Sequence, residues 1–379
     1  MSRLIFEQGP IRPPSEAESL LLRLTRNCPW NRCQFCTTYR GETFSRRTVE
    51  EIKSDVDTVS RILDRLREMS VSLGYNGEIN LQVLSDAYQT GDYYVIHVAS
   101  WMYRGGRNIF LQDANSLIMK TSELVDVLEY TREKLPTVDR ITSYARSKTL
   151  LRKSPGALAD IRRAGLNRIH VGMESGSDAV LKFINKGVTS KEHIEAGRRV
   201  VEAGISLSLY VILGLGGRLW PEDHILETAR ALNQINPDYI RLRTLAVSPG
   251  TPLYDRLMAG EFAEQTEDEI VAGERILIEK LQGISSEVVS DHMLNLLEEV
   301  GGRLPESKEH LLGVIDRYLS MPGADRLNFR LGRRAGLYRW LDDMSDPVRK
   351  ARVEALARRL SSEGRLDGTL SSLRAQMLY

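Results

Sequence analysis

The stretch Leu20-Leu-Leu-Arg-Leu-Thr-Arg-Asn-Cys28-Pro-Trp-Asn-Arg-Cys33-Gln-Phe-Cys36 carries the decisive pattern of this chain of 379 residues. An apolar run of strand length is followed directly by a polar loop that holds all three cysteines of the chain. Thiolates are the preferred ligands of iron–sulfur clusters and of soft metals. Three of them on one loop can hold three irons of a cubane, which leaves the fourth iron open to a small molecule.

The bulk composition is ordinary for a soluble enzyme, with 42% hydrophobic and 27% charged residues and a net charge of +1. A charge so close to zero gives no global electrostatic argument for nucleic acid or an anionic membrane as partner. The first ten residues lack the apolar core of a signal peptide, and no apolar run approaches the length that spans a bilayer. An odd number of clustered cysteines argues against disulfides, so we expect a reducing cytoplasm.

Strand-length apolar runs alternate with helical patterns between residues 20 and 260. This alternation predicts parallel strands joined by right-handed crossovers, and six such units predict an α/β fold, a partial (β/α)6 TIM-like barrel. The cysteine loop follows the first strand and therefore belongs to the face where such barrels carry their chemistry. The expected strands are 20–24, 109–111, 141–144, 168–171, 206–213 and 239–245. The expected helices are 49–73, 122–135, 157–164, 191–202 and 222–235.

We expect three segments: an N-terminal segment 1–19, the barrel 20–260 and a helical C-terminal domain 261–379. Residues 74–107 are rich in Tyr and Gly and are longer than a barrel connection requires. They are predicted to be an insertion that forms a lid or wall of the active site. Beyond residue 266 strand-like runs vanish and helical patterns dominate. Examples are 288–299 and 309–319.

Four interpretations of the cysteine cluster compete. A zinc site needs a fourth ligand, for example His170 or His292. The spacing C-x4-C-x2-C is also that of plant-type [2Fe–2S] ferredoxins, which require a fourth cysteine that this chain lacks. Buried structural cysteines are usually scattered through apolar segments instead of clustered beside Pro, Asn and Arg. The remaining interpretation is an open-site [4Fe–4S] cluster with Cys28, Cys33 and Cys36 as its ligands.

The loop resembles the signature of the radical S-adenosylmethionine (radical SAM) enzymes, C-x3-C-x-aromatic-C after the first barrel strand. Phe35 stands at the aromatic position, and four residues instead of three separate Cys28 from Cys33. Residues 169–187 are similar to the fourth-strand segment of the branch that contains methylthiotransferases and oxygen-independent coproporphyrinogen oxidase. The resemblance implies a [4Fe–4S] cluster and S-adenosylmethionine (SAM) as cofactors.

The resemblance also implies which residues contact SAM. Glu174 stands where the family has a side chain that contacts the ribose, and Lys186 stands where it has a basic residue that pairs with the SAM carboxylate. Read without the cysteines, Glu174 is a helix-start acid. The turn from Ile212 to Gly217 is similar to the adenine-binding turn of the family, where glycine lets the backbone approach the purine closely. The residues that we expect around SAM are Phe35, Asp113, Tyr144, Glu174, Lys186, Ile212 and Gly214.

Two features of the C-terminal segment bear on the substrate. His292 and Asn295 are three residues apart and would share one face of a helix, with a satisfied helix-start histidine as the alternative. A group of arginines is interpreted either as a phosphate or RNA site or, because Asp342, Asp343 and Asp346 follow it, as a solvated helical face. These arginines are Arg326, Arg330, Arg333, Arg334 and Arg339.

We therefore expect a radical SAM enzyme that cleaves SAM reductively to a 5′-deoxyadenosyl radical, which abstracts hydrogen from a small molecule such as a tetrapyrrole or another cofactor precursor. An external electron donor such as flavodoxin or ferredoxin is implied, and neither nucleic acid nor a membrane is expected as partner. The cobalamin-binding domain that precedes the barrel in many relatives is expected to be absent. Two alternatives stay open: a radical SAM modifier of tRNA or peptide, and a non-catalytic iron–sulfur or zinc protein.

Overall fold

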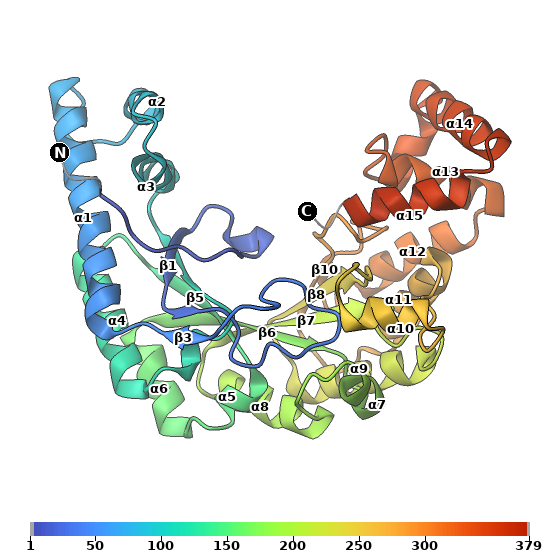
Figure 1. The fold of residues 1–379 in the computed structure, drawn as a ribbon, viewed down its shortest axis with the longest axis horizontal. Coiled ribbons are helices and arrows are strands. Elements are labelled where there is room, and N and C mark those ends of the chain that lie inside the picture. The colour runs from blue at the N-terminus through green and yellow to red at the C-terminus, as the bar shows by residue number, and fades with distance from the viewer. Residues whose placement is uncertain (1–3, 377–379) are drawn as a thin grey trace. The chain divides into compact units, whose positions relative to one another are not determined.

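A computed structural model describes residues 4–376 of the chain (Figure 1). The chain divides into two compact units, and this division cuts across the barrel strands instead of following the boundaries at 19/20 and 260/261. The three predicted domains therefore stay a prediction. The first unit consists of Met1–Asn31, Thr38–Val171 and Ala196–Leu207. The second unit consists of Arg32–Thr37, Gly172–Glu195 and Ser208–Tyr379.

The first unit is built on parallel strands in the order β1-β4-β5-β6, and the predicted strands and helices of this part are confirmed. Its helices form a layer outside the strands in Figure 1. The strands are β1 (Leu20–Arg23), β4 (Asn108–Gln112), β5 (Arg140–Ala145) and β6 (Leu166–Glu174), whose last three residues belong to the second unit. The helices are α1 (Val49–Ser72), α4 (Thr121–Lys134), the short α5 (Ser147–Leu150) and α6 (Pro155–Ala164).

Local sequence signals set the ends of these helices. Helix α1 begins at a capping box, in which the Thr48 side chain accepts from the Glu51 backbone and Glu51 accepts from the Thr48 backbone. Helix α6 begins after Ser154, whose hydroxyl caps the first turn, and ends at Gly165 with φ of 126°. Glycine has no Cβ and adopts this backbone conformation at little cost. Gly165 therefore ends the helix and redirects the chain toward β6.

The insertion 74–107 is helical. It contains α2 (Leu81–Gln89) and α3 (Tyr93–Tyr103), which are capped by Asn80 and Asp92. Helix α3 packs against α2, α1 and β1. The role of this segment as a lid or wall of an active site stays a prediction.

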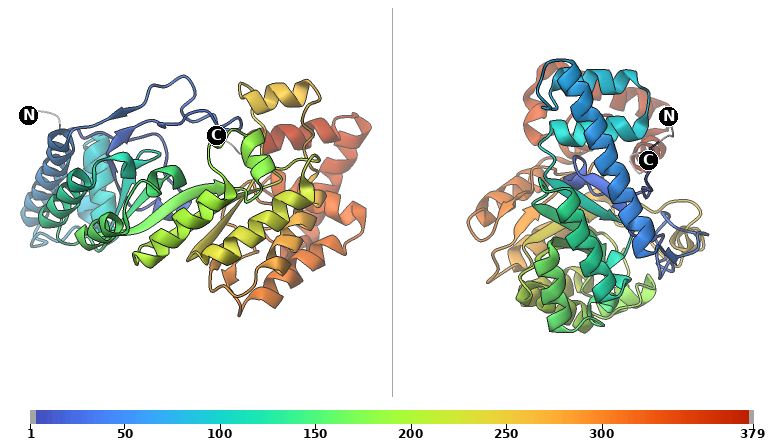
Figure 2. Two further views of the ribbon diagram at one scale, coloured as in Figure 1. Left: turned by 90° about the horizontal axis from the view of Figure 1, so that it is seen from below. Right: turned by 90° about the vertical axis from the view of Figure 1, so that its left-hand side faces the viewer.

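The second unit contains strands in the order β7-β8-β9-β10, and it is rich in helices. Helix α9 packs against α11, and α11 packs against α12 (Figures 1 and 2). The strands are β7 (Ser206–Leu213), β8 (Tyr239–Thr244), β9 (Glu287–Val289) and β10 (Gly302–Arg303). The helices are α7 (Asp178–Phe183), α8 (Ser190–Glu202, shared with the first unit), α9 (Pro221–Ile235), α10 (Pro252–Met258), α11 (Glu267–Lys280), α12 (Lys308–Leu319), α13 (Gly323–Arg334), α14 (Pro347–Ser362) and α15 (Leu366–Gln376).

Two expectations for the C-terminal part were wrong. Strands do occur beyond residue 266, and residues 288–299 form a strand and irregular turns instead of a helix. Strand β9 pairs in parallel with β8, with Val288 opposite Ile240, and β10 pairs antiparallel with β9. Backbone pairing with a strand about fifty residues away thus overrides a helical spacing that only nearby residues define. The helix predicted at 309–319 is confirmed as α12.

The chain has the predicted α/β fold, a mostly parallel central sheet with helices in the arrangement of a partial TIM-like barrel. The strands are buried and rich in Leu, Ile and Val, as expected for parallel strands that are covered by helices. Among residues 4–376, no helix has the length and apolar character that a membrane span requires.

Candidate functional site

The cysteine loop starts and ends at a small two-stranded antiparallel ladder in the first unit. Strand β2 (Thr25–Arg26) enters the loop and β3 (Ser45–Arg46) leaves it. Two asparagines with left-handed backbone brace the loop between them: Asn27 (φ of 68°) donates to the carbonyl of Thr43 at 2.7 Å. Asn31 (φ of 46°) donates to the carbonyls of Tyr39 and Glu42 at 2.5 and 3.2 Å. Asparagine tolerates this conformation better than most residues, which gives a sequence signal that we did not use.

The three cysteines are free thiols, each half-buried, and the Cys28 sulfur accepts from the backbone of Asn31 at 3.4 Å. Cys28 belongs to the first unit, and Cys33 and Cys36 belong to the second. Within the described residues, no group of three or more His, Cys, Asp or Glu side chains is gathered in a metal-binding arrangement. Three reduced thiols on one irregular loop still have the donor chemistry of an iron–sulfur site. Their assignment as iron ligands stays a prediction.

Asp113, after β4, is fully buried and anchors the start of the cysteine loop. One carboxylate oxygen accepts from Arg23 at 2.7 Å and from the backbone of Asn27 at 3.1 Å, and the other accepts from the Tyr39 hydroxyl. Burial, and next the Asp113 carboxylate, raise the pKa of Tyr39, which keeps the phenol protonated as a donor. Contact of Asp113 with the SAM amino group stays a prediction. The charge of Arg23 within an otherwise apolar strand was the signal for this buried network.

Tyr144 lies near the end of β5 in the first unit. Its ring packs edge-on against Phe110 with centroids 5.1 Å apart, and against His170 at 5.8 Å. Glu16 lies 3.7 Å from His170 and is also bonded to Arg140. His170 is therefore buried together with the carboxylate of Glu16. The role of Tyr144 toward SAM stays a prediction.

Glu174 and Lys186 lie together in the second unit, at the end of β6 and just after α7. The Lys186 ammonium donates to the Glu174 carboxylate at 2.8 Å, and the two side chains are only 12% and 11% exposed. Glu174 has a φ of 68°, a conformation that is costly for a residue other than glycine and that clusters at functional sites. A Cβ at Gly172 would lie 2.1 Å from the Glu174 carboxylate and 3.1 Å from the Lys186 ammonium. The ion pair between the two side chains was not predicted, and the contact of either residue with SAM stays a prediction.

A buried hydrogen-bond chain ties the end of β6 to the end of β7 through helix α9. The Ser177 backbone donates to the Ser175 hydroxyl at 3.0 Å, and Ser175 lies 2.8 Å from Nδ1 of His224. Nε2 of His224 lies 3.0 Å from the carbonyl of Ile212. Since a carbonyl only accepts, Nε2 carries the proton and Nδ1 accepts from Ser175. Burial lowers the pKa of His224 to about 4, so the ring is neutral. We did not predict this histidine.

The glycine turn after β7 needs its glycines for space as well as for backbone conformation. Gly214 has a φ of 80°, and a Cβ there would lie 3.0 Å from Ile270. At Gly217 (φ of 54°) a Cβ would lie 2.4 Å from the ring of Phe262. The turn is therefore closely packed within the second unit, and its contact with adenine stays a prediction.

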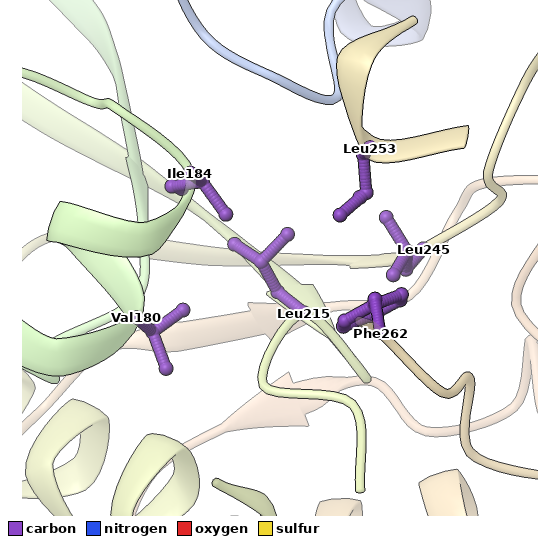
Figure 3. Packing of buried hydrophobic residues seen from close by; sticks show 6 residues of the cluster. All are labelled: Val180, Ile184, Leu215, Leu245, Leu253 and Phe262. Atoms are coloured by element: carbon purple, nitrogen blue, oxygen red, sulfur yellow. The ribbon is translucent and has the colours of Figure 1, made fainter. Parts of the chain in front are cut away.

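Phe35, the aromatic residue of the cysteine loop, packs against an apolar cluster in the second unit. Figure 3 shows this cluster, to which α7, the glycine turn and α10 all contribute. Ile212 is also packed against it. Its buried members are Val180, Ile184, Leu215, Leu245, Leu253 and Phe262. The cluster thus holds the second half of the cysteine loop, although the predicted contact of Phe35 with SAM stays a prediction.

The C-terminal candidates have structural roles. No helix forms at residues 290–295, so the predicted shared face is wrong. Asn295 is buried, accepts from Thr244 at 3.1 Å and donates to the Leu242 carbonyl at 3.0 Å. Burial lowers the pKa of His292 to about 4, and its Nδ1 accepts from the backbone of Leu294.

The arginine group is not an open basic surface, because each member is paired with a carboxylate. Asp268 pairs with Arg326 and Arg330, Glu298 with Arg333 and Arg339, and Glu267 with Arg334. Arg333 and Arg334 are buried. These ion pairs join residues 35 to 67 positions apart, which the local charge pattern does not reveal.

Comparison with known protein families places the chain. Residues 22–232, more than half of the chain, match the Radical SAM superfamily, and the protein belongs to that superfamily. This segment contains the cysteine loop, the Glu174–Lys186 pair and the glycine turn. Members of this superfamily are enzymes that use a [4Fe–4S] cluster and SAM.

Curated relatives match only part of the chain, and the chain matches only part of each of them. The chain is 29% identical over 104 residues to an uncharacterized protein of Methanocaldococcus jannaschii (27% of this chain, 32% of the relative). It is 31% identical over 156 residues to the tRNA-2-methylthio-N(6)-dimethylallyladenosine synthase of Dictyoglomus thermophilum (39% of this chain, 33% of the relative). The chain thus matches about a third of the length of these relatives.

Among solved structures, the chain is similar to the cobalamin-dependent S-adenosylmethionine radical enzyme OxsB with a TM-score of 0.45 and 14% identity, over 96% of this chain and 54% of that one. It is also similar to an N-terminally truncated Elp3 of Methanocaldococcus infernus, with a TM-score of 0.39 and 14% identity, over 54% of this chain and 51% of that one.

Proposed function

We propose that the protein cleaves SAM reductively at an open-site [4Fe–4S] cluster and uses the product radical to abstract hydrogen from a small-molecule substrate. The observation that carries the proposal is the match of residues 22–232 to the superfamily together with three free thiols on the loop after β1. When bound, the cluster and SAM supply the cleavage of a carbon–sulfur bond to methionine and a 5′-deoxyadenosyl radical. We place this activity in a reducing cytoplasm, where free thiols persist.

The residues of the chain would bind and orient SAM. Lys186 would hold the SAM carboxylate and Glu174 the ribose hydroxyls, and each would exchange part of their mutual ion pair for the ligand. The closely packed turn at Gly214 and Gly217 would bring backbone next to the adenine. Cys28, Cys33 and Cys36 would hold the three ligated irons, and the carboxylate of Asp113 would keep the start of their loop in place.

A small-molecule substrate agrees with the charges of the C-terminal part. RNA binding relies on basic side chains that neutralise phosphates, whereas all five arginines of residues 326–339 named above are paired with carboxylates of the chain itself. A cofactor precursor such as a tetrapyrrole is the substrate class that we favour.

The proposal is tested with anaerobically reconstituted protein that is reduced with dithionite and incubated with SAM. We expect 5′-deoxyadenosine, and we expect its loss together with part of the iron in Cys33→Ala. Protein that carries four irons and yields no 5′-deoxyadenosine, alone or with cell extract as a source of substrate, would show that the cluster is only structural.

A second candidate is a tRNA modifier, because six curated relatives carry names of tRNA-modifying enzymes. This function requires an affinity for tRNA that falls steeply with rising salt concentration. Filter binding at low salt distinguishes the two candidates. No binding up to micromolar tRNA would remove the second candidate and leave the small-molecule proposal.

A further inference from the structure

A depression of about 610 Å³ opens on the second unit beside the cysteine loop. Gln34, which stands between Cys33 and Cys36, lines it together with residues of α7 and α10, with Asn185 after α7 and with Trp220 at the start of α9. The aromatic residues of the depression are Phe183 and Trp220, and its charged residues are Lys182 and Arg256. Its described lining contains no carboxylate.

The backbone of Gln34 is hydrogen-bonded to the end of α7 and to α10. The Gln34 backbone donates to the carbonyl of Ile184 at 2.9 Å, and its carbonyl accepts from the backbone of Leu253 at 3.1 Å. The next residue, Phe35, packs against the apolar cluster of Figure 3, against which Phe183 and Trp220 also pack. Continuous packing therefore connects the loop that carries Cys33 and Cys36 to the surface of the depression.

The floor of the depression is aromatic. The rings of Phe183 and Trp220 lie 5.1 Å apart in an edge-to-face arrangement, and Phe183 also stacks on Phe262 at 5.8 Å. The Arg256 guanidinium lies 4.5 Å from the centre of the Phe183 ring. Aromatic residues and arginine are enriched at the centres of protein–protein interfaces, and Trp220 is partly exposed here.

The charge of the depression is positive. Lys182 is exposed, and the nearest carboxylate that pairs with Arg256 is Glu261 at 3.9 Å, which is the limit of an ion pair. Arg32, on the cysteine loop itself, is also exposed. A surface that is basic and aromatic and lies beside the predicted iron ligands is complementary to an acidic protein.

We propose that this depression is the docking site of the electron donor, a small acidic protein that carries electrons singly at low potential. The inference rests on the proposed function, because reductive cleavage of SAM consumes one electron that the chain has no group to supply. The donor is oxidised by one electron for each SAM that is cleaved. That electron enters the carbon–sulfur bond, which breaks to methionine and the 5′-deoxyadenosyl radical. Docking here brings the donor next to the loop of Cys33 and Cys36, and electron transfer is fastest at short range.

The test compares two reductants on the reconstituted holoprotein. The variant is Lys182→Glu with Arg256→Glu, and the matched control is Lys280→Glu, which reverses one exposed charge at the end of α11. We expect 5′-deoxyadenosine formation driven by reduced flavodoxin to fall about tenfold or more in the variant, because charges that face a partner control association. Dithionite needs no docking, so the rate with dithionite stays within about twofold of wild type.

A binding measurement without turnover gives the second readout. Oxidised flavodoxin should bind wild type and Lys280→Glu with equal, salt-sensitive affinity, and the double variant about tenfold more weakly. The milder pair Lys182→Gln with Arg256→Gln should show an intermediate loss. Equal flavodoxin binding and equal flavodoxin-driven rates in all variants would overturn the docking site. Absence of 5′-deoxyadenosine from wild type with dithionite would instead overturn the proposed function.

Discussion

At the scale of single residues, the Glu174–Lys186 pair is the part of the candidate site that the structure defines best. Two side chains twelve positions apart lie 2.8 Å from each other, and Glu174 has a left-handed backbone conformation. Strain of this kind costs about 1–3 kcal/mol and persists only where the surroundings enforce it. The site therefore holds a carboxylate and an ammonium in fixed positions before any ligand binds.

Lys186→Ala should weaken SAM binding by about tenfold to a hundredfold, since a hydrogen bond to a charged group contributes about 1.5–3 kcal/mol. Iron content should be unchanged, because Lys186 is remote in sequence from the cysteines. Calorimetric titration of the reconstituted protein with SAM measures the effect.

Two further variants sharpen this prediction. Gly172→Ala leaves both charges in place but inserts a methyl group between them, so it should also weaken SAM binding. Lys182→Ala removes an exposed charge on the neighbouring helix α7 and should leave SAM affinity unchanged. An unaltered affinity in both Lys186→Ala and Gly172→Ala would exclude this pair from the SAM site.

At the scale of elements, helix α9 is the support for the strand ends that carry the candidate site. His224 joins Ser175 and Ile212, and the Thr228 hydroxyl accepts from the backbone of Gly176 at 2.8 Å. A Cβ at Gly176 would lie 2.3 Å from a backbone oxygen of α9, so the helix and the strand end are in close contact. The residues after Glu174 are thus fixed by α9.

His224→Phe should lower the free energy of unfolding by about 2 kcal/mol at pH 7.5, because it removes the hydrogen bonds of the ring to a buried hydroxyl and a buried carbonyl. The pKa of His224 is about 4 in the folded protein, below its ordinary 6.5. The unfolded chain therefore binds the proton first as the pH falls, and the benefit of the neutral ring is lost between pH 6.5 and 4.

Urea titrations at pH 7.5 and pH 5 measure this effect. The difference between wild type and His224→Phe should shrink at the lower pH. Leu226→Phe, an exposed change on the same helix, is the control and should be close to neutral. A constant difference at the two pH values would argue against a neutral buried ring.

The ion pairs of α13 allow a second test at this scale. Arg334 is 1% exposed, pairs with Glu267 and donates to the carbonyls of Met293 and Leu294. Arg334→Ala leaves these groups buried and unpaired and should lower the free energy of unfolding by about 3–5 kcal/mol. The Arg339 side chain is 62% exposed in its pair with Glu298, so the same change there should leave the stability nearly unchanged.

Denaturant unfolding of the two variants checks this contrast. Neither change should alter the binding of tRNA relative to wild type. If Arg334→Ala and Arg339→Ala instead reduced tRNA affinity without loss of stability, the arginines would form a nucleic-acid surface and the tRNA candidate would gain support.

At the scale of the whole molecule, the buried ionisable groups shape how stability depends on pH. Glu274 on α11 is fully buried, and burial raises its pKa to about 8 from an ordinary 4.5. The folded protein therefore keeps a proton that the unfolded chain has lost, and stability falls as the pH rises from 4.5 to 8. His224 acts in the opposite direction below pH 6.5.

Glu274→Gln removes this ionisation and should raise the free energy of unfolding at pH 8 by on the order of 3–5 kcal/mol. Below about pH 3.5 the carboxyl is protonated in both states, so the variant and wild type should differ little there. Unfolding at a series of pH values measures the curve, and a uniform offset across the range would contradict the shift.

Much of the fold was predictable because buried strands and helices have apolar patterns that can be recognised within a short stretch of sequence. The six barrel strands and the helices between them follow from apolar runs and cap residues that lie within one element. The grouped cysteines and the spacing of Glu174 and Lys186 likewise carry the candidate chemistry within short segments. These features determined the superfamily and its cofactors from the sequence alone.

Tertiary structure alone decided the rest, because the partners are far apart in the chain. Residues 288–299 have a helical spacing, but pairing with β8 makes their first part a strand. Arg334 pairs with Glu267, which is 67 positions away, and Arg23 pairs with Asp113, which is 90 positions away. His224 is hydrogen-bonded to both Ser175 and Ile212. Such contacts depend on which distant segments pack together, and the local sequence pattern does not specify this.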